Sequence, residues 1–403
     1  MKIQRNYPAF TVTKKGQRWL EGAHPWLYED EIVQSPEEME NGGLADIFSQ
    51  EGKYLGTGLY SEKSKIRLRL ISSNANDTFD DAFWERRVRY AWEYRKSVMS
   101  AEDLNCCRVI FGEADQFPGL TVDRYSDYLV AQTMSYGMER LKSRLFPIIY
   151  RVLNEDTTIK GIYERNDDAL RALEGLEENK GWYIEGVPKG EDTSFTIEEN
   201  GVKYMIDIEN GQKTGFYPDQ KYNRLSVGKI ARGKNVLDCF THTGSFALNA
   251  ALGGAKKVTG VDISASAIKL ARENAKLNGV EADFVVQDAF DYLDTVTKGQ
   301  YDLIILDPPA FTKSRKTIKN AYRGYRDINH KAMKALGRGG YLASCSCSHF
   351  MSSAMFEDML KEAAKMGNFR LRSVETRQQA CDHPILWNVP ETNYLKFYIL
   401  QVV

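Results

Sequence analysis

The stretch from Val236 to Asp262 limits most strongly what this chain can fold into. Residues 236–240 form a short apolar run, as in a buried parallel strand, and residues 245–252 carry apolar side chains at helical spacing. Two glycines end that helix, and residues 258–261 read as a second strand that ends on Asp262. Strand, tight turn, helix, strand and acid, in this order, predict the nucleotide-binding end of a Rossmann-like, doubly wound α/β sheet.

The turn after the first strand indicates which nucleotide-like ligand the sheet binds. A dinucleotide's pyrophosphate needs several glycines at fixed spacing, and this turn contains only Gly244. A ligand without phosphate needs no such cradle, and a sulfonium with an amino acid end would be attracted to Asp238. Asp262 can accept the hydroxyls of a ribose. The pattern favours S-adenosylmethionine over NAD, and the alternative is that both acids merely cap local structure.

The residues after Asp262 continue the doubly wound pattern. Helices are predicted at 264–277 and 351–365, strands at 282–286, 301–306 and 340–344, and a closing hairpin from 369–377 and 394–401. The predicted strands end on or next to Asp238, Asp262, Asp288, Asp307 and Cys345. Ligands of open α/β sheets bind at the edge where these strand ends meet, and we expect Asp288 to reach the adenine amino group.

Two motifs at this edge predict the reaction. In DPPAF, the prolines hold Asp307, whose carboxyl can hydrogen-bond the ring nitrogen and exocyclic amine of cytosine. In SCSCS, a thiolate that adds to carbon 6 of cytosine turns carbon 5 into an enamine-like carbon that can attack a sulfonium methyl. Cys347 lies past the strand end between serines and is the favoured nucleophile, with Cys345 as the alternative. Asp307 would share a proton with the ring nitrogen as charge develops.

The stretch NGQKTGFYPDQKYNR, residues 210–224, is predicted to be a functional loop that enters a helix. It combines two glycines, an aromatic pair and many hydrogen-bonding side chains. Thr214, Asp219 and Gln220 are expected to reach the cofactor bound near Gly244. The alternative is an ordinary interdomain loop.

Composition sets the outer limits. The chain has 403 residues, 42% of them hydrophobic, which predicts two or three domains with ordinary cores. No apolar run approaches the roughly 18 residues of a membrane span, and the first residues lack a signal-peptide core, so we expect a cytoplasmic protein without membrane contact. The six cysteines form no paired CxxC sets, which predicts neither a metal site nor a disulfide framework.

Basic side chains are unevenly distributed in a chain whose net charge is −1. Residues 1–20 carry five Lys or Arg and no acid, and residues 313–338 carry nine against Asp327 alone. Separated basic patches favour a polyanion such as RNA, although a charge run is also typical of a solvated face. In the second patch, Lys313, Arg323, Tyr325 and Arg326 are predicted to stack on bases and contact phosphates, unless the tyrosine packs inward at a helix start.

The regions before the Rossmann-like domain are predicted to form two further domains. Residues 1–72 contain short strand patterns without a long helical period, which predicts a compact β-domain. The stretches GAHPWLYEDEI and ADIFSQEGKYLGTGLYSEKSKIRLRLI resemble a PUA domain, a small RNA-binding barrel. Residues 73–195 alternate helix and strand patterns, which predicts an α+β domain, and a polar linker around 188–202 leads to the domain of residues 196–403. The candidate phosphate contacts of the first domain are Lys14, Lys15, Arg18, Lys65, Arg67 and Arg69.

From about residue 200 onwards, the chain resembles the RlmI-like family of ribosomal RNA cytosine-C5 methyltransferases. The shared stretches are KTGFYPDQ, VLDCFTHTGSFA, VDIS, ARENAKLNG, DAFDYL, DPPAF, YRGYRDIN, SCSCS and QQACDHP. The two preceding domains match the same architecture, so the resemblance covers essentially the whole chain. It implies a class I methyltransferase that uses S-adenosylmethionine (SAM) to form 5-methylcytosine in ribosomal RNA, expected to be that of the large subunit. Cys347 corresponds to the family's nucleophile, and the additional Cys345 departs from the family pattern.

The resemblance also implies a set of cofactor contacts. They are Asp238, Phe240, Gly244, Asp262, Asp288 and Asp307, to which we add the adjacent Ile263, Ala289 and Pro308 together with Thr214 and Gln220. Three other functions stay open: methylation of an exocyclic base nitrogen, a noncatalytic RNA-binding assembly factor, and a hydride-transferring dehydrogenase. The sequence leaves the oligomeric state undecided, with a homodimer as one assembly that the chain could form.

Overall fold

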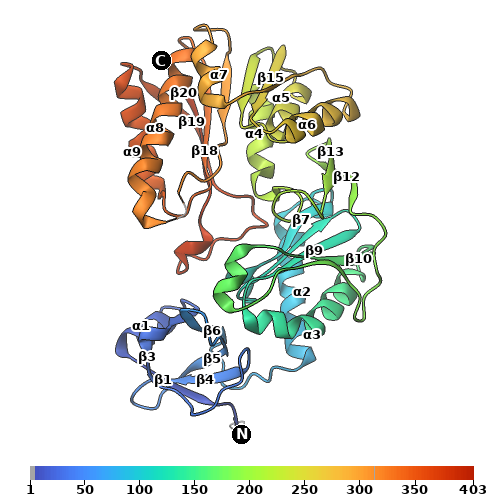
Figure 1. Ribbon diagram of the computed structural model, residues 1–403, viewed down its shortest axis with the longest axis vertical. Coiled ribbons are helices and arrows are strands. Elements are labelled where there is room, and N and C mark those ends of the chain that lie inside the picture. The colour runs from blue at the N-terminus through green and yellow to red at the C-terminus, as the bar shows by residue number, and fades with distance from the viewer. Residues whose placement is uncertain (1–4, 313) are drawn as a thin grey trace. The chain divides into compact units, whose positions relative to one another are not determined.

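A computed structural model describes residues 5–312 and 314–403. By its internal contacts the chain forms two compact units, and each is described by itself (Figure 1). Unit 1 comprises the chain up to Phe195 together with Ile206–Pro218 and Cys381–Thr392. Unit 2 comprises Thr196–Met205, Asp219–Ala380 and Asn393–Val403. The division into three domains at residues 72 and 195 stays a prediction. No helix in the described ranges has the length and apolar character needed to cross a membrane.

The first part of unit 1 is a six-stranded sheet with one helix. Its strand order is β2-β6-β5-β4-β1-β3, and only the β1–β4 pair is parallel. Helix α1, Lys14–Glu21, begins where the side chain of Thr13 accepts the N–H of Gly16 at 3.1 Å. This helix was not predicted from the sequence, because its short length gives little periodic signal. The strands are β1 Ala9–Val12, β2 Trp26–Tyr28, β3 Ile32–Gln34, β4 Leu44–Phe48, β5 Tyr54–Tyr60 and β6 Ile66–Ser72.

The second part of unit 1 is a five-stranded sheet covered by two long helices, α2 (Asp81–Val98) and α3 (Tyr136–Leu153). The helices pack against each other, and their apolar faces share one core with the sheet. Asp80 caps the start of α2 and Ser135 that of α3. Helix and strand thus alternate here as predicted for an α+β region. In spatial order the strands are β11 Asn179–Tyr183, β10 Gly161–Asn166, β9 Tyr128–Thr133, β8 Leu120–Tyr125 and β7 Cys106–Phe111.

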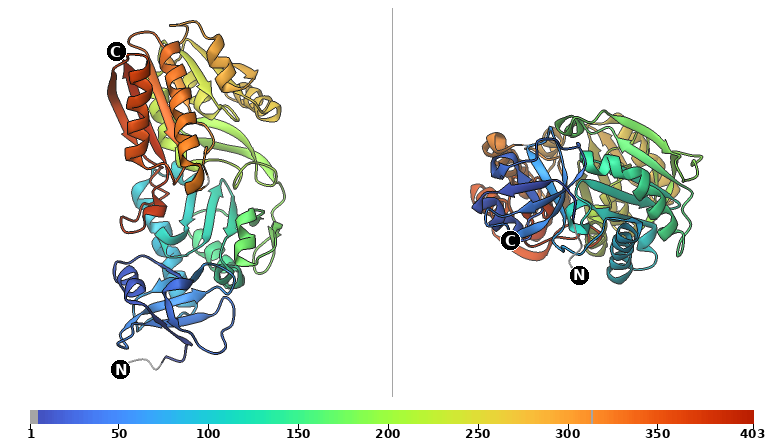
Figure 2. Two further views of the ribbon diagram at one scale, coloured as in Figure 1. Left: turned by 60° about the vertical axis from the view of Figure 1, so that its left-hand side comes forward. Right: turned by 90° about the horizontal axis from the view of Figure 1, so that it is seen from below.

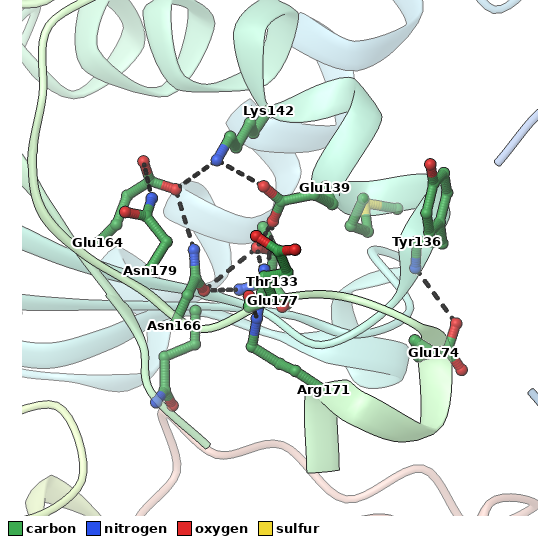
Figure 3. A network of polar contacts seen from close by, with 12 residues as sticks. Thr133, Tyr136, Glu139, Lys142, Glu164, Asn166, Arg171, Glu174, Glu177 and Asn179 are labelled. Atoms are coloured by element: carbon green, nitrogen blue, oxygen red, sulfur yellow. Dashed lines mark hydrogen bonds and ion pairs between the residues drawn. The ribbon is translucent and has the colours of Figure 1, made fainter. Parts of the chain in front are cut away.

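A buried network of charged and polar side chains joins α3, β10 and the short helical turn η4, Ala169–Glu174 (Figure 3). The ammonium of Lys142 donates to Glu139 at 2.6 Å and to Glu164 at 2.8 Å. Arg171 donates to Glu139 at 3.1 Å and to the hydroxyl of Thr133 at 3.0 Å. Burial alone would raise the pKa of Glu139, but the hydrogen bonds from Lys142 and Thr133 outweigh it and lower the pKa. Each buried charge in this network therefore has a partner of opposite sign.

Two later segments of the chain are built into unit 1. In the first, residues 206–218, the hydroxyl of Thr214 donates to Asp123 at 2.6 Å. In the second, residues 381–392, the carbonyl oxygen of Asp382 accepts from the guanidinium of Arg95 at 2.8 Å. The carboxylate of Asp382 also accepts the main-chain N–H of Arg108 at 2.8 Å. Because these bonds are buried, both segments are firmly held parts of this unit.

Unit 2 contains a seven-stranded sheet in the order β16-β15-β14-β17-β18-β20-β19. The strands β14 to β18 are parallel, and β20 runs antiparallel to both of its neighbours. The chain starts at the central strand β14, moves outward to β16 and returns to β17, so the order reverses between β14 and β17. The strands are β14 Asn235–Cys239, β15 Lys257–Asp262, β16 Asp283–Val286, β17 Leu303–Leu306, β18 Tyr341–Ser346, β19 Leu371–Arg377 and β20 Lys396–Val402.

Helices cover both faces of this sheet (Figures 1 and 2). Helices α4 (Lys221–Ile230), α5 (Ser245–Leu252) and α6 (Ala265–Leu277) lie on one face, where α5 contacts both of the others. Helices α7 (Ala289–Thr295), α8 (Ile318–Ala335) and α9 (Ser353–Met366) share an apolar core with the opposite face. Figure 2 shows α8 and α9 side by side in its left view.

The predicted Rossmann-like fold is confirmed, and the differences are local. The predicted hairpin of residues 369–377 and 394–401 is present as the antiparallel pair β19 and β20. Helix α7 was not predicted because only two turns follow β16. The predicted linker at 188–202 was wrong in part, because Ser194–Glu199 forms strand β12, which pairs with β13, Val202–Asp207.

Candidate active site at the carboxyl edge of the sheet

The turn between β14 and α5 has an unusual backbone. Phe240, His242 and Gly244 all have positive φ, at 63°, 50° and 84°. A Cβ on Gly244 would lie 3.1 Å from the ring of Phe284 and 3.2 Å from the Cβ of Ala271, so the positive φ favours glycine and the space for a side chain is tight. Left-handed residues other than glycine cost about 1–3 kcal/mol each and gather at ligand sites. The strain at Phe240 and His242 is therefore typical of a ligand-binding turn.

Asp238, near the end of β14, is a buried acid with one unsatisfied oxygen. Its Oδ2 accepts the hydroxyl of Thr241 at 2.5 Å and the N–H of Ala247 at 3.0 Å. Among the described residues, its Oδ1 has no hydrogen-bond partner. Burial raises the pKa of Asp238 to about 7, and the nearby acids Asp307 and Asp262 add to this. A cation or an N–H donor of a ligand would satisfy Oδ1.

Asp262 and Asp288 follow the next two strands along the edge. The carboxylate of Asp262 accepts the main-chain N–H groups of His242 and Ser264, both at 2.9 Å, and each oxygen keeps a further lone pair. Asp288 caps helix α7 through one of its oxygens. Ile263 is 73% exposed directly after Asp262. An acid that accepts hydroxyls beside an exposed apolar side chain suits a nucleoside.

Asp307 follows β17 and faces a further acid. Its Oδ1 accepts from the amide of Gln220 at 3.0 Å. Burial, together with the negative charge of Asp219, raises the pKa of Asp307 to about 7. Arg224 offsets this only in part, because its guanidinium is already paired with Glu199 at 2.7 Å. The carboxyl of Asp307 can therefore be protonated near neutral pH.

Asp219 adds to the excess of acid at this edge. Its Oδ2 accepts the hydroxyl of Tyr394 at 2.8 Å, and its Oδ1 is buried without a partner among the described residues. Asp219 and Asp238 thus each offer a buried acceptor atom, and Asp307 lies in the electrostatic range of both. Among the described residues, this edge carries more carboxyl groups than cations, which favours a ligand with positive charge.

The two cysteines at the end of β18 lie in different environments. Cys345 is buried within the strand, and burial, together with Asp307, raises the pKa of its thiol well above the usual value. Cys347 follows the last residue of β18 and is partly exposed. Its charge acts on Tyr325 and on Lys396. Of the two thiols, Cys347 is the accessible one.

These features fit SAM, the cofactor predicted from the sequence. Within the described residues, Asp238 and Asp219 offer unsatisfied acceptors for cationic and amino groups, and Asp262 has lone pairs for ribose hydroxyls. Unit 2 brings together all but one of the predicted cofactor residues at the carboxyl edge of its sheet: Asp238, Phe240, Gly244, Asp262, Ile263, Asp288, Ala289, Asp307, Pro308 and Gln220.

The remaining predicted cofactor residue, Thr214, belongs to unit 1. Its side chain is buried, and its hydroxyl is shared between Asp123 at 2.6 Å and the phenol of Tyr125 at 2.8 Å. Its observed contacts are those of a residue that fixes residues 206–218 to strand β8.

The basic residues predicted to bind RNA divide into exposed and internally paired groups. Lys14 and Arg18 are exposed on α1, where they line a hollow of about 510 Å³ with Gln17 and Glu51. Arg69 is buried and paired with Glu174 at 2.7 Å, so its contacts are structural. The other three candidates of this region are Lys15, which is exposed and paired with Glu31, Arg67, which is paired with Glu29 at 2.5 Å, and Lys65, which is exposed.

The second basic patch lies largely on α8. Arg323 is exposed, whereas Arg326 is paired with Asp327 and Glu362. Tyr325 is fully buried, and its phenol accepts the hydroxyl of Ser346 at 3.1 Å, so it packs inward as the alternative interpretation expected. Lys313 lies outside the described residues.

Two residues at notable positions were not among those predicted from the sequence. Lys396 opens β20 beside the SCSCS motif and is only 4% exposed; the signal was a single lysine in the apolar run YLKFYIL. Trp387 is 98% exposed on the segment 381–392 of unit 1. Asn388 beside it donates to the carbonyl oxygens of Gly22 and Ala23 at 3.1 and 2.6 Å, so the exposed indole stands on an anchored loop.

Comparisons with known proteins agree with this geometry. Residues 181–393 match the profile of a family described as S-adenosylmethionine-dependent methyltransferase, and residues 10–73 match a PUA-like domain. The chain is 39% identical over 396 residues to ribosomal RNA large subunit methyltransferase I of Aeromonas hydrophila, covering 97% of this chain and 98% of the relative. It is 35% identical over 404 residues to the protein of the same name from Klebsiella pneumoniae, covering 98% and 99%.

Solved structures support the fold. A Streptococcus mutans structure assigned as a SAM-dependent methyltransferase superimposes with a TM-score of 0.81 at 21% identity, covering 98% of this chain and all of that one. A second methyltransferase structure, determined in complex with SAH, has a TM-score of 0.82 at 21% identity, again covering 98% of this chain and 100% of the other.

Proposed function

The chain belongs to the ribosomal RNA large subunit methyltransferase I family, and from this premise we propose that it methylates carbon 5 of a cytosine in large-subunit ribosomal RNA. The reaction is covalent catalysis with Cys347 as the nucleophile and Asp307 as the acid. One observation carries the proposal: a partly exposed thiol follows β18, next to the strand whose end holds a carboxyl with a pKa of about 7.

Cys347 activates the base. Carbon 5 of cytosine is a poor nucleophile, and addition of the Cys347 thiolate to carbon 6 makes it electron-rich. The target base must leave its stack to reach this edge, as in other enzymes that modify a base. Cys345 does not fit the nucleophile's role as well, because it is buried and its environment favours the neutral thiol.

Asp307 balances the charge that develops on the ring. A carboxyl with a pKa of about 7 is partly protonated at neutral pH, so it can donate a hydrogen bond or a proton to the ring nitrogen as the thiolate adds. Gln220 orients this carboxyl through its hydrogen bond to Oδ1. When the carbon 5 proton is later removed by a base, the electron pair of the carbon–sulfur bond returns to sulfur and the thiolate leaves.

The remaining edge residues hold the methyl donor. SAM supplies, when bound, a methyl group made electrophilic by its sulfonium. In this proposal Asp238 binds cationic groups of the donor through Oδ1, which has no hydrogen-bond partner among the described residues, and Asp262 accepts ribose hydroxyls. Asp288 and the exposed Ile263 contact the adenine in this proposal. Because Thr214 is held inside unit 1, we leave it out of this set.

We further propose that RNA contacts the exposed basic residues Lys14, Arg18, Lys65 and Arg323, with Trp387 as a stacking surface for an unpaired base. Arg69 and Tyr325 are left out because they are buried.

Trp387→Ala should weaken RNA binding by about 1–3 kcal/mol at every salt concentration. Arg18→Ala should instead reduce the salt dependence of binding. A filter-binding titration at several salt concentrations separates the two, and unchanged affinity in both variants would contradict these proposed RNA contacts.

The central experiment traps the covalent adduct. RNA that contains 5-fluorocytosine at the target cannot lose fluorine as a cation, so the enzyme should stay attached to it through Cys347 after methyl transfer. Cys347→Ser should abolish both attachment and methyl transfer, whereas Cys345→Ser should keep both. Full methyl transfer by Cys347→Ala would exclude the thiol mechanism and favour methylation of an exocyclic nitrogen. Binding of RNA without any methyl transfer would instead favour an assembly factor.

A further inference from the structure

Lys396 is a buried cation directly beside the proposed nucleophile. It opens β20, where its Cα pairs with that of Ser346, the residue before Cys347. Its ammonium donates to two carbonyl oxygens, that of Ser348 at 2.6 Å and that of Tyr394 at 2.8 Å. Ser348 is the residue after Cys347. The lysine is therefore fixed against the main chain on both sides of the thiol.

The acceptors of this ammonium are unusual for a buried lysine. Both are neutral carbonyl oxygens, and among the described residues no carboxylate accepts from Lys396. Burying a cation without a counter-charge is costly. Burial accordingly lowers the pKa of Lys396 to about 8, and the charge of Cys347 acts in the opposite direction. The ionised thiol is thus the counter-charge that this environment favours.

We propose that the ammonium of Lys396 holds the Cys347 thiol in its thiolate form, which makes Lys396 the positioning residue that activates the nucleophile. This inference rests on the proposed function, because it gives the thiolate its task. The thiol proton passes to solvent before the base binds, and the sulfur electron pair is then free to form the bond to carbon 6. Lys396 itself forms no bond to the substrate.

Among the described residues, the other titratable groups around this pair do not supply the same effect. Asp307 and Cys345 lie on the β17 and β18 side, Tyr325 on α8, and His349 and Tyr394 on the flanking loops. Burial raises the pKa of Tyr325 to about 12, so its phenol stays neutral at pH 7. Asp307 and Cys345 can only add negative charge. Lys396 is the group in this set that is mostly protonated, and so positively charged, at pH 7.

The test measures thiol chemistry rather than turnover. The alkylation rate of Cys347 by iodoacetamide is followed from pH 5 to 10 in the full-length protein, with peptide mass spectrometry to separate Cys347 from Cys345. Removing a neighbouring opposite charge raises a pKa substantially, so Lys396→Gln should slow alkylation at pH 7 by about tenfold or more and restore it at high pH. Lys396→Arg, which keeps the charge, should stay close to the wild type.

Two controls keep the inference falsifiable. Gln retains a hydrogen-bond donor for the Ser348 carbonyl oxygen, so a general loss of structure is avoided, and unchanged thermal unfolding of both variants verifies it. Equal pH profiles for Lys396→Gln and the wild type would overturn the role of Lys396. A shifted profile combined with full methyl transfer by Cys347→Ser would instead leave the thiol chemistry intact and overturn the proposed function.

Discussion

Two buried polar clusters in this protein contrast in how their charges are balanced. In the network of unit 1, Lys142 and Arg171 neutralise Glu139 and Glu164, and the pKa of Glu139 is lowered despite burial (Figure 3). At the carboxyl edge in unit 2, Asp238 and Asp307 have pKa values of about 7, and buried oxygens of Asp238 and Asp219 have no partner in the described part of the chain. Balanced burial stabilises a fold, whereas unbalanced burial holds groups in the state that binding and chemistry need.

The largest expected effect comes from removing the acidic group of Asp307 at the carboxyl edge of the sheet in unit 2. Asp307→Asn keeps the shape and the hydrogen bond to Gln220 but removes the proton that the ring nitrogen needs. Loss of a general acid typically costs about 10²–10⁴-fold in rate, so kcat for methyl transfer should fall by that factor. Unfolding should be unaffected or shift to higher temperature. A loss of stability with normal kcat would show that this acid is structural, like those of the network.

The converse change removes one cation from the charge-balanced network of unit 1. Arg171→Met removes one of the two cations that pair with Glu139 and takes a donor from the buried oxygens of Thr133, and loss of a buried hydrogen-bond partner typically costs about 1–3 kcal/mol. All six tryptophans belong to unit 1, so urea unfolding followed by tryptophan fluorescence reports on this unit. Methyl transfer per folded molecule should stay normal. An unchanged urea midpoint would mean that the network contributes little.

The two clusters should respond to pH with opposite signs. The folded pKa of Asp238 is raised above its unfolded value, so its contribution to stability is present at low pH and is lost as the pH rises from about 4 to about 7. The folded pKa of Glu139 is lowered, so its contribution is present at neutral pH and is lost as the pH falls below about 4.

Each of these two pH-dependent contributions to stability can be removed by replacing the carboxyl side chain with the corresponding amide. Asp238→Asn should flatten the decline of the free energy of unfolding between pH 4 and pH 7, measured by far-ultraviolet circular dichroism, with tryptophan fluorescence as the reference for unit 1. Glu139→Gln should leave that interval unchanged and weaken stability mainly at neutral pH. If Asp238→Asn retained the full wild-type slope, the carboxyl would be ionised in the folded protein, and the contrast would fail.

The sequence was sufficient to predict which residues lie at the carboxyl edge of the sheet, because each parallel strand has a polar side chain at or near its end. Asp262 and Asp307 stand at the ends of apolar runs and Asp238 lies near the end of another, and parallel strands bring such ends together without further information. The partners of Lys396 and Arg171 could not be predicted in this way. Lys396 lies beside Cys347 only because β20 pairs with β18, and Arg171 reaches Glu139 through a turn with little periodic pattern.

The membership of the two crossing segments in unit 1 was also beyond the sequence. Residues 206–218 and 381–392 lie within the stretch assigned to the Rossmann-like domain, yet Asp123 and Arg95 hold them. No local pattern marks such a return of the chain. The same reason explains Thr214: its position before Gln220 suggested a cofactor contact, and its side chain instead bonds to Asp123 and Tyr125.

The smallest expected effect comes from an exposed ion pair, which serves as the reference for the network of unit 1. Lys257 and Asp283 form an ion pair of 3.1 Å between β15 and β16 in which both side chains are more than 60% exposed. Water screens such a pair, so Lys257→Gln should change the free energy of unfolding by only about 0–1 kcal/mol. Far-ultraviolet circular dichroism during urea unfolding measures it against Arg171→Met. If the two substitutions lowered the free energy of unfolding equally, burial would not explain why the network of unit 1 is stabilising. The two clusters would then differ only in the number of partners that each charge has.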